Sequence, residues 1–198
     1  MGCGKGSIAQ TVTCKGYAYV GIDINKSRLL EAFKVRSKGD VFFLQGDINS
    51  IPFRPCFKLV LATEIIEHFE NFYRPLLEIN NILIDNGYLL ISTPNKASLE
   101  GVKGKIFEIV LKKRWTAWNN EHKHIFSSFE ILSLLKSNFK IVRALGYYFL
   151  PRIPMSVRFE GRFWFGGRLR FSRTHHKPLN MLGFQIIALL KKISGKKD

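Results

Sequence analysis

The sequence is poor in cysteine, has no long apolar run and holds few acidic residues in its second half. Its three cysteines are an odd number at spacings that match no metal site, and its beginning does not resemble a signal peptide. No apolar stretch approaches the roughly 18 residues that a helix needs to span a bilayer. These absences predict a protein of the reducing cytoplasm.

The shortage of acidic residues gives the second half of the chain a strong net positive charge. Residues 1–100 hold 11 Lys and Arg against 10 Asp and Glu, whereas residues 101–198 hold 20 against 5, within a net charge of +16. Such asymmetry favours an anionic partner, whether nucleic acid, a membrane surface or a phosphorylated substrate. A lysine-rich solvated surface explains the same count without a partner. The 46% hydrophobic and 23% charged fractions predict one globular domain over residues 1–198.

Three alternate glycines in residues 2–6 begin the chain and precede Ser7–Gln10, a pattern that predicts a tight turn leading into a helix. The free N–H groups of such a helix's first turn attract a carboxylate or phosphate. The next strand candidate, Tyr17–Ile22, stops at Asp23. Glycine turn, helix, strand and carboxylate follow one another as in a Rossmann-like half-unit, in which the carboxylate accepts hydrogen bonds from ribose hydroxyls.

Alternating strands and helices continue after Asp23. The strand candidates are 41–45, 57–62 and 88–93, and the helix candidate between the last two is 73–83. Polar groups follow the first two of these strands, in Gly46-Asp47-Ile48 and in Glu64–Phe69. The pattern predicts an α/β fold: a Rossmann-like, doubly wound, mostly parallel sheet with helices on both faces and ligands at the carboxyl ends of the strands.

Five motifs resemble, in order and spacing, the class I S-adenosylmethionine-dependent methyltransferases. They are Gly2-Cys3-Gly4-Lys5-Gly6, Gly21-Ile22-Asp23, Gly46-Asp47-Ile48, Glu64-Ile65-Ile66-Glu67-His68-Phe69 and Ile91-Ser92-Thr93-Pro94-Asn95. The likeness covers residues 1–95 and is nearest to the small-molecule branch that includes quinone-biosynthesis O-methyltransferases. It implies S-adenosylmethionine as cofactor and a final antiparallel strand.

The resemblance also implies roles for particular residues. Gly2, Gly4 and Gly6 would bind the methionine end of the cofactor, Asp23 the ribose, Asp47 with Ile48 the adenine, and Glu64 would lie beside the cofactor. His68 would lie beside the methyl acceptor and take its proton, although methyl transfer from a sulfonium depends mostly on proximity and in-line approach. His68 as a bystander on a helix turn is the alternative.

The beginning of the chain departs from the family pattern. In that pattern the glycine turn follows an apolar first strand at the centre of the sheet, whereas here only Met1 precedes Gly2. Without that strand its two neighbours would lose a ladder partner, at a cost on the order of 1 to 3 kcal/mol for each buried unpaired group. We therefore expect a truncated chain or a start codon placed too late.

Residues 96–183 are expected to cover the acceptor side. Residues 98–114 predict a helix with Val102, Ile106, Ile109 and Val110 inward, and the resemblance places acceptor-side residues just after it: Trp115, Trp118, His122 and His124. Two histidines at i and i+2 without partnered cysteines or clustered acids are poor evidence for a metal, so none is expected. Ser127-Ser128 with Glu130 predicts another helix start.

Residues 151–177 interleave arginines with aromatic side chains, and residues 184–191 form an apolar run before a basic tail. The first segment suits an anionic membrane surface, which would make the protein peripheral to the membrane; it suits RNA less well, and an insertion without a partner is also open. The second is predicted to be a last strand, at the sheet edge. The sequence leaves the oligomeric state unknown.

The sequence thus predicts a methyltransferase that uses S-adenosylmethionine and acts on a small or lipid-like oxygen or nitrogen nucleophile. Two alternatives stay open. One is an RNA methyltransferase that uses the basic second half, and the other is a non-catalytic binding protein of the same fold.

Overall fold

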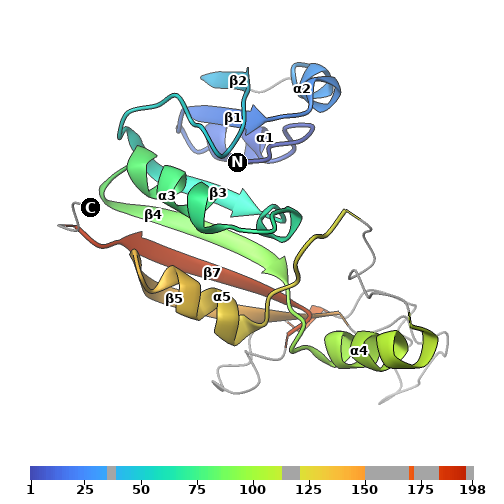
Figure 1. The fold of residues 1–198 in the computed structure, drawn as a ribbon. Helices are drawn as coiled ribbons and strands as arrows, with labels where there is room; N and C mark the ends of the chain where they lie inside the picture. The colour runs from blue at the N-terminus through green and yellow to red at the C-terminus, as the bar shows by residue number, and fades with distance from the viewer. Residues whose placement is uncertain (35–38, 113–120, 150–169, 172–182, 195–198) are drawn as a thin grey trace, which may run out of the picture.

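The computed structural model describes residues 1–34, 39–112, 121–149, 170–171 and 183–194, whose strands form two sheets (Figure 1). The smaller sheet pairs β1 (Tyr19–Asp23) with β2 (Val41–Gln45). The larger has the order β3 (Phe57–Thr63), β4 (Leu83–Pro94), β7 (Gln185–Lys192), β5 (Phe139–Phe149) and β6 (Arg170–Phe171). With the helices between them, these strands confirm the α/β class, and β7 is the final antiparallel strand that was predicted.

The direction of the strands sets where a ligand can bind. β1 runs parallel to β2 and β3 runs parallel to β4, and the carboxyl ends of β1, β3 and β4 point to the same side of the molecule (Figure 1). Ligands of open α/β sheets bind outside these carboxyl ends. The residues that follow β1, β3 and β4 are therefore the ones from which a site would be built.

β7 does not lie at the sheet edge, so that expectation is wrong. Leu190 of β7 pairs with Leu89 of β4 on one side and with Ile141 of β5 on the other, antiparallel to both. Ile186 and Ala188 are buried with it. The middle of the strand, Ile186–Leu190, is entirely apolar and has no polar face for solvent, which explains its interior place in the sheet.

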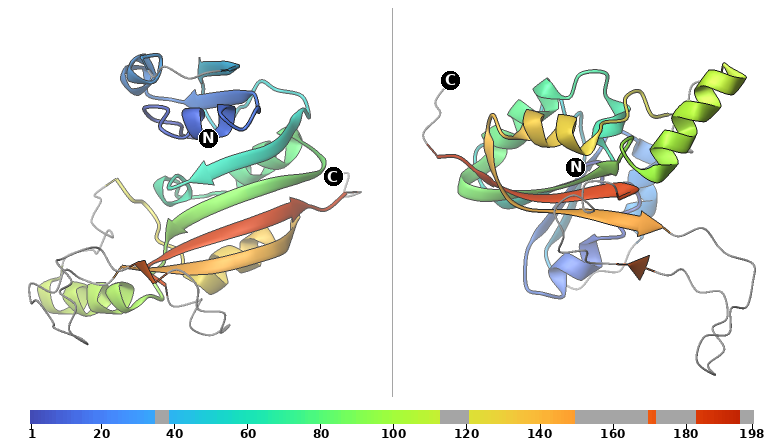
Figure 2. Two further views of the ribbon diagram at one scale, coloured as in Figure 1. Left: turned by 180° about the vertical axis from the view of Figure 1, so that it is seen from behind. Right: turned by 90° about the horizontal axis from the view of Figure 1, so that it is seen from below.

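The helices are α1 (Ala9–Thr13), α2 (Lys26–Ala32), the short 3₁₀ helix η1 (Ile66–His68), α3 (Tyr73–Ile82), α4 (Leu99–Leu111) and α5 (Ser128–Leu135). α3 and α5 cover one face of the larger sheet, and α1 lies on the other side of the molecule (Figure 2). Leu76 and Ile79 of α3 and Ile131 and Leu135 of α5 are fully buried in one hydrophobic core with the sheet. These side chains are the buried faces of α3 and α5.

Residues Met1–Cys3 lie between the two sheets. The amine of Met1 donates a hydrogen bond to the carbonyl of Leu61 in β3 (2.8 Å), and the N–H of Cys3 donates to the carbonyl of Ile22 in β1 (2.9 Å). Burial lowers the pKa of the Met1 ammonium, because a charged group loses hydration there. Within the described residues these two hydrogen bonds join β1 and β3 through the first three residues. The expectation of a truncated chain or a late start codon stays a prediction.

α4 differs from its prediction in the direction of its apolar face. Ser98 caps the helix by accepting from the N–H of Gly101 (3.0 Å), as a helix start there requires. However, Val102, Ile106, Ile109 and Val110 are exposed rather than inward, with Ile109 at 72%. The prediction of a buried stripe was wrong because α4 extends beyond the sheet, so that no core formed by the described residues packs on this stripe (Figure 1). No helix among the described residues is long and apolar enough to cross a membrane.

α5 begins with the capping box that the sequence predicted. The hydroxyl of Ser127 accepts from the N–H of Glu130 (3.2 Å), and the carboxylate of Glu130 accepts from the N–H of Ser127 (2.7 Å). We expect Ser127→Ala to lower the free energy of unfolding by about 1 kcal/mol, since it removes one of these two bonds. Urea unfolding followed by circular dichroism measures the change. Ser137→Ala is the matched control, because Ser137 is an exposed serine past the end of the same helix; an equal loss in both variants would contradict the capping role.

Candidate functional site

The glycine turn before α1 needs glycine at all three alternate positions. Gly2, Gly4 and Gly6 have φ angles of 59°, 51° and 73°, which side chains rarely allow. A Cβ on Gly6 would lie 2.8 Å from the ring of Phe43, and one on Gly2 would lie 2.5 Å from Ile65. A Cβ on Gly4 would have no atom within 4 Å, so the turn is open at its middle glycine. The turn therefore offers bare backbone to a ligand at this point.

Asp23, at the end of β1, is tied to this turn. It is 6% exposed, its Oδ2 accepts from the N–H of Gly4 (2.7 Å), and its Oδ1 accepts from the N–H of Asn25 (2.9 Å). A carboxylate has about four acceptor positions, so two remain after these bonds. The structure thus brings together the predicted methionine-end and ribose-binding residues, and Asp23 keeps capacity for hydroxyl donors.

The other predicted cofactor residues occupy different environments. Asp47 is exposed and its Oδ1 accepts from both the N–H and the side-chain amide of Asn49 (2.9 Å each). Ile48 is 7% exposed and its side chain belongs to the hydrophobic core, which leaves only its backbone for a ligand. Glu64 has a φ of 53°, unusual for a non-glycine residue, and its Oε1 accepts from the hydroxyl of Ser92 (2.8 Å). That bond fixes Glu64 at the carboxyl end of β3.

Glu67, His68 and His122 meet beyond the end of β3. Each offers one carboxylate oxygen or ring nitrogen, and these atoms lie within 4.8 Å of one another. His122 Nε2 is 3.8 Å from Glu67 Oε1, and the two imidazole rings have centroids 5.2 Å apart, edge to face. These residue types suit either a proton shared among them or a bound cation, so the expectation of no metal stays a prediction.

Glu67 is the acid of this cluster, and its pKa is strongly shifted. Its side chain is fully buried, and burial raises its pKa to about 8, with the nearby Glu64 carboxylate adding to the rise. The hydroxyl of Thr93 donates to its Oε2 (3.3 Å), which opposes the shift only in part. Its Oε1 has no hydrogen bond to any residue that the structure describes. A carboxyl group in this environment is protonated at neutral pH, which spares the interior an isolated charge.

Backbone hydrogen bonds hold the chain around His122 against η1. The carbonyl of Glu67 accepts from the N–H groups of Lys123 (2.8 Å) and His124 (3.1 Å). The Nδ1 of His68 lies 3.3 Å from the carbonyl of Glu121. The structure therefore brings together His68 and His122, as the acceptor-side prediction requires. Trp115 and Trp118 lie outside the described residues.

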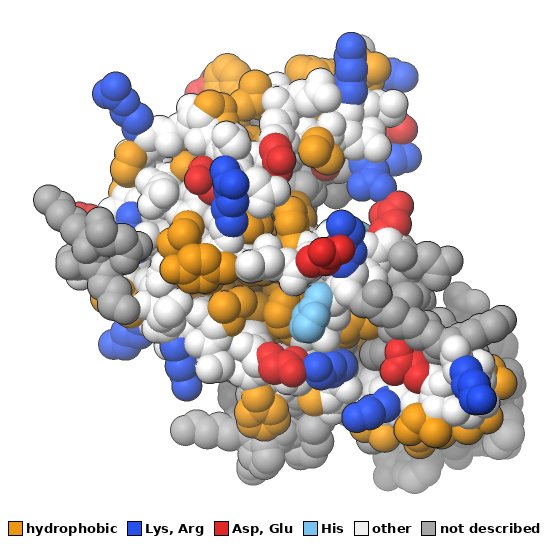
Figure 3. Space-filling view, viewed as in Figure 1, with side chains coloured by type: hydrophobic (Ala, Val, Ile, Leu, Met, Phe, Trp, Pro, Cys, Tyr) orange, Lys and Arg blue, Asp and Glu red, His pale blue; other side chains and the backbone are white. Residues whose placement is uncertain are grey.

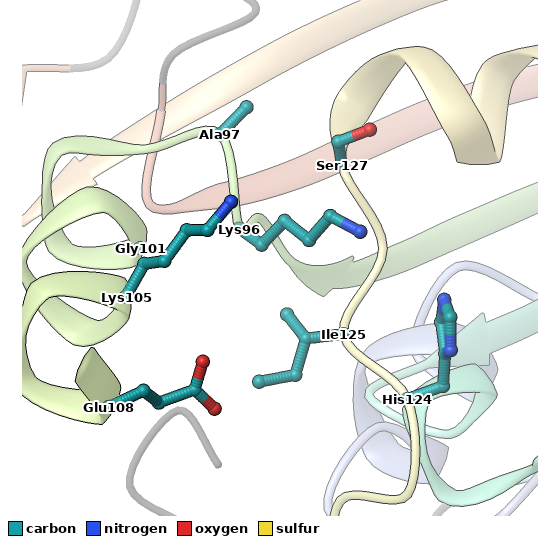
Figure 4. Close-up of a pocket in the computed structure, with 8 residues that line it drawn as sticks. All are labelled: Lys96, Ala97, Gly101, Lys105, Glu108, His124, Ile125 and Ser127. Carbon is teal, nitrogen blue, oxygen red and sulfur yellow. The ribbon is translucent and has the colours of Figure 1, made fainter. Parts of the chain in front are cut away.

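A pocket of about 470 Å³ opens between α4 and residues 124–127. Figure 4 shows the side chains of Lys96, Lys105 and Glu108 directed into this space, with His124 at its far side. The ring of His124 packs against Phe126, with centroids 4.2 Å apart. His124, a predicted acceptor-side residue, therefore lines a cavity. This cavity is neither closed nor strongly apolar.

Sequence reasoning missed Asn95, which organises this side of the sheet. Asn95 is 1% exposed; its Oδ1 accepts from the N–H groups of Ala97 and Ser128 (3.0 Å each), and its amide donates to the carbonyl of Gly183 (2.8 Å). It thus joins the ends of β4, α5 and β7. One feature of the sequence indicated Asn95: it is a polar residue directly after the buried strand, in Ser92-Thr93-Pro94-Asn95, where a loop leaves the sheet.

Comparison with known proteins finds one matching family model and several similar sequences. Residues 1–91 match the family model described as "Methyltransferase domain". The chain is 29% identical over 156 residues to a ubiquinone biosynthesis O-methyltransferase of Rickettsia typhi, covering 75% of this chain and 62% of that protein. It is 31% identical over 153 residues to an uncharacterized protein of Methanocaldococcus jannaschii, covering 77% of this chain and 58% of that protein. The chain therefore spans about three fifths of the length of these relatives.

Solved structures agree on the fold. A S-adenosylmethionine-dependent methyltransferase of Methanosarcina mazei superposes with a TM-score of 0.66 at 18% identity, covering 97% of this chain and 90% of the other. A protein of Thermotoga maritima described as a possible histamine N-methyltransferase gives 0.64 at 18% identity, with 97% and 79% covered. At this identity the likeness establishes the fold alone, and the fold is Rossmann-like.

Proposed function

Since this chain is related in sequence and fold to the class I S-adenosylmethionine-dependent methyltransferases, we propose that it transfers a methyl group from S-adenosylmethionine to a small or lipid-like nucleophile, with oxygen as the favoured acceptor atom. The observation that carries the proposal is the hydrogen bond from Gly4 to Asp23, because it joins the glycine turn and the acid after β1 into one site. The ubiquinone name of the Rickettsia relative supports a phenolic oxygen on a lipid-like molecule.

The residues present suit the cofactor. The open backbone at Gly4 and the N-terminal end of α1 would hold the methionine part, and the spare acceptor positions of Asp23 would take the ribose hydroxyls. Asp47 would contact the adenine, and Glu64 would lie near the sulfonium. S-adenosylmethionine held by these residues would supply an electrophilic methyl group for the acceptor oxygen, with S-adenosylhomocysteine as the second product.

The residues of this chain would act on the acceptor. His68 is half-buried in η1, beside the buried pair of Glu67 and His122 and the segment that leads to the pocket. In this role His68 takes the proton from the acceptor hydroxyl, and the two neighbours hold its ring by packing. The pocket lined by Lys96 and His124 would admit the acceptor.

The two finer expectations about partners and location stay proposals. Residues 151–177, from which an anionic membrane surface was predicted, lie outside the described residues except Arg170 and Phe171. Cytoplasmic location, peripheral membrane association and RNA as an acceptor accordingly rest on the sequence alone. A steep fall of RNA affinity with salt would favour the RNA alternative.

Isothermal titration of S-adenosylmethionine and S-adenosylhomocysteine into the protein tests the cofactor step. We expect both to bind at one site, with saturation. Methyl transfer is then measured from labelled S-adenosylmethionine to prenylated phenols of increasing chain length. Cofactor binding without transfer to any phenol would move the proposal to the non-catalytic binding protein, and no binding would reject the cofactor site itself.

His68→Asn is expected to slow methyl transfer by about 100-fold while leaving the dissociation constant of S-adenosylmethionine unchanged. The reason is that His68 would serve the acceptor proton, with its Nδ1 near the carbonyl of Glu121, whereas the glycine turn is held by Asp23. Single-turnover assays measure the rate and titration measures the affinity. An unchanged rate across the pH profile would assign His68 the bystander role.

A further inference from the structure

Residues 46–56 connect β2 of the smaller sheet to β3 of the larger, and they include Asp47, the predicted adenine contact. The carbonyl of Asp47 accepts from the N–H of Ser50 (3.1 Å), and its Oδ1 accepts from the backbone and side-chain amides of Asn49 (2.9 Å each). These bonds shape the turn around Asp47. They all lie inside the connection, so the position of Asp47 relative to the rest of the protein depends on other contacts.

Two side chains of α3 hold this connection from outside. The Oε2 of Glu78 accepts from the N–H of Ile51 (3.1 Å), and the Nε of Arg74 donates to the carbonyl of Asn49 (3.1 Å). Arg74 and Glu78 are four residues apart in the helix, so they lie on the same side of it. The two bonds therefore fix the chain just after Asp47 against one side of α3.

Apolar side chains of the connection are buried in the same core as α3. Ile48 and Ile51 are each 7% exposed, and they belong to one hydrophobic cluster with Leu76 and Ile79 of α3. Apolar burial is non-directional, whereas a hydrogen bond fixes distance and angle. The bond from Ile51 to the partly buried carboxylate of Glu78 is charge-assisted, which makes it the stronger kind. Glu78 therefore sets the register of the connection on the helix.

We propose that Arg74 and Glu78 are positioning residues for the cofactor, which hold Asp47 where the adenine amino group can donate to it. Asn49 occupies Oδ1 of Asp47, so Oδ2 is the oxygen that would accept from this amino group. Asp23 ends β1 in the smaller sheet, whereas α3 packs on the larger one. The ribose and adenine contacts are thus held by different parts of the fold, and α3 controls the adenine end. This inference rests on the proposed function, because it requires S-adenosylmethionine to bind at this site.

Isothermal titration with S-adenosylhomocysteine and S-inosylhomocysteine tests this role, because the second ligand has a carbonyl oxygen in place of the adenine amino group. The unaltered protein is expected to bind the adenine ligand about tenfold more tightly. Glu78→Ala should weaken its binding by about fivefold and hardly change that of the inosine ligand, so that the preference falls to about twofold. Glu78→Gln keeps an acceptor oxygen for the N–H of Ile51 and should retain most of the preference. Arg74→Ala should weaken adenine-ligand binding by about threefold, since its bond is exposed to solvent.

Asp85→Ala is the matched control, because Asp85 is an exposed acid shortly after the same helix. It should leave both dissociation constants unchanged. On the face of the molecule that carries α3, acidic and basic side chains lie side by side, so the loss of one charge changes the local field little (Figure 3).

The preference between the two ligands separates positioning from a merely structural role. An unchanged preference in Glu78→Ala would overturn the proposal. So would an equal loss of affinity for both ligands together with a lower unfolding temperature, since Glu78 would then only stabilise the fold. Binding of neither ligand by the unaltered protein would reject the proposed cofactor site itself, and the positioning role with it.

Discussion

Asp23→Ala is expected to weaken S-adenosylmethionine binding by about 100-fold, the product of two losses. The ribose hydroxyls lose a charged acceptor, and the glycine turn loses the bond from Gly4 to Oδ2 that holds it against β1. A hydrogen bond to a charged group contributes roughly 1.5 to 3 kcal/mol, which corresponds to about 10-fold to 100-fold in affinity. Isothermal titration of the cofactor and its demethylated product measures the change.

Two further variants separate the two losses. Asp23→Asn keeps one carbonyl acceptor for a backbone N–H but loses the charge, so its affinity should fall between those of the unaltered protein and the alanine variant. Asp47→Ala is the comparison for an exposed carboxylate, whose bonds go to Asn49, and it should weaken binding by about tenfold or less. The assignment of Asp23 fails if its alanine variant binds the cofactor as tightly as the unaltered protein.

Local rules in the sequence were sufficient for most helices and strands. The Asn25 side chain caps α2 by accepting from the N–H of Arg28, and the capping box of Ser127 and Glu130 begins α5. Both follow from neighbours two to three residues apart, which a sequence displays directly. The approach of Asp23 to Gly4 was also predictable, because the order of turn, helix and strand places both at one sheet edge.

The errors arose where the answer depends on distant parts of the chain. The apolar stripe of α4 satisfies the helical period whether it meets a core or solvent, so Ile106 and Ile109 could not be assigned a side from spacing. The place of β7 depends on the pairing of Leu190 with two strands far away in sequence. Whether an apolar helix face or strand is buried, and where it lies in the sheet, depends on tertiary contacts and not on the spacing of apolar residues alone.

In the candidate site, too, local motifs were predictable from the sequence and contacts between distant residues were not. His68 was singled out from its motif, but Glu67 next to it was given no role. Its importance comes from complete burial and from His122, which is brought to it by the backbone bonds of the carbonyl of Glu67 to Lys123 and His124. The sequence separation of this pair hides it from any local pattern.

Raising the pH should destabilise the folded protein through Glu67, and Glu67→Gln should remove that effect. The pKa of Glu67 is about 8 in the folded protein, above its ordinary value of 4.5, because burial and the Glu64 carboxylate disfavour the charged form. Between these two values the unfolded chain releases a proton that the folded chain keeps. The stabilising contribution is therefore complete below about pH 4.5 and is lost as the pH rises through about 8, a loss of a few kcal/mol.

Urea unfolding from about pH 5 to about pH 9 measures this dependence in the unaltered protein and in Glu67→Gln. His122 Nε2 lies 3.8 Å from Glu67 Oε1, so the difference between the two curves reports the titration of this pair together. Glu70→Gln is the matched control, because Glu70 is an exposed acid of the same loop, with its side chain 84% accessible, and its curve should parallel that of the unaltered protein. Parallel curves for Glu67→Gln as well would show that Glu67 is ionised in the folded state. Its charge would then have to be balanced inside the cluster, by a protonated His122 or by a bound cation, and the way to decide between them is to repeat the measurement with a chelator.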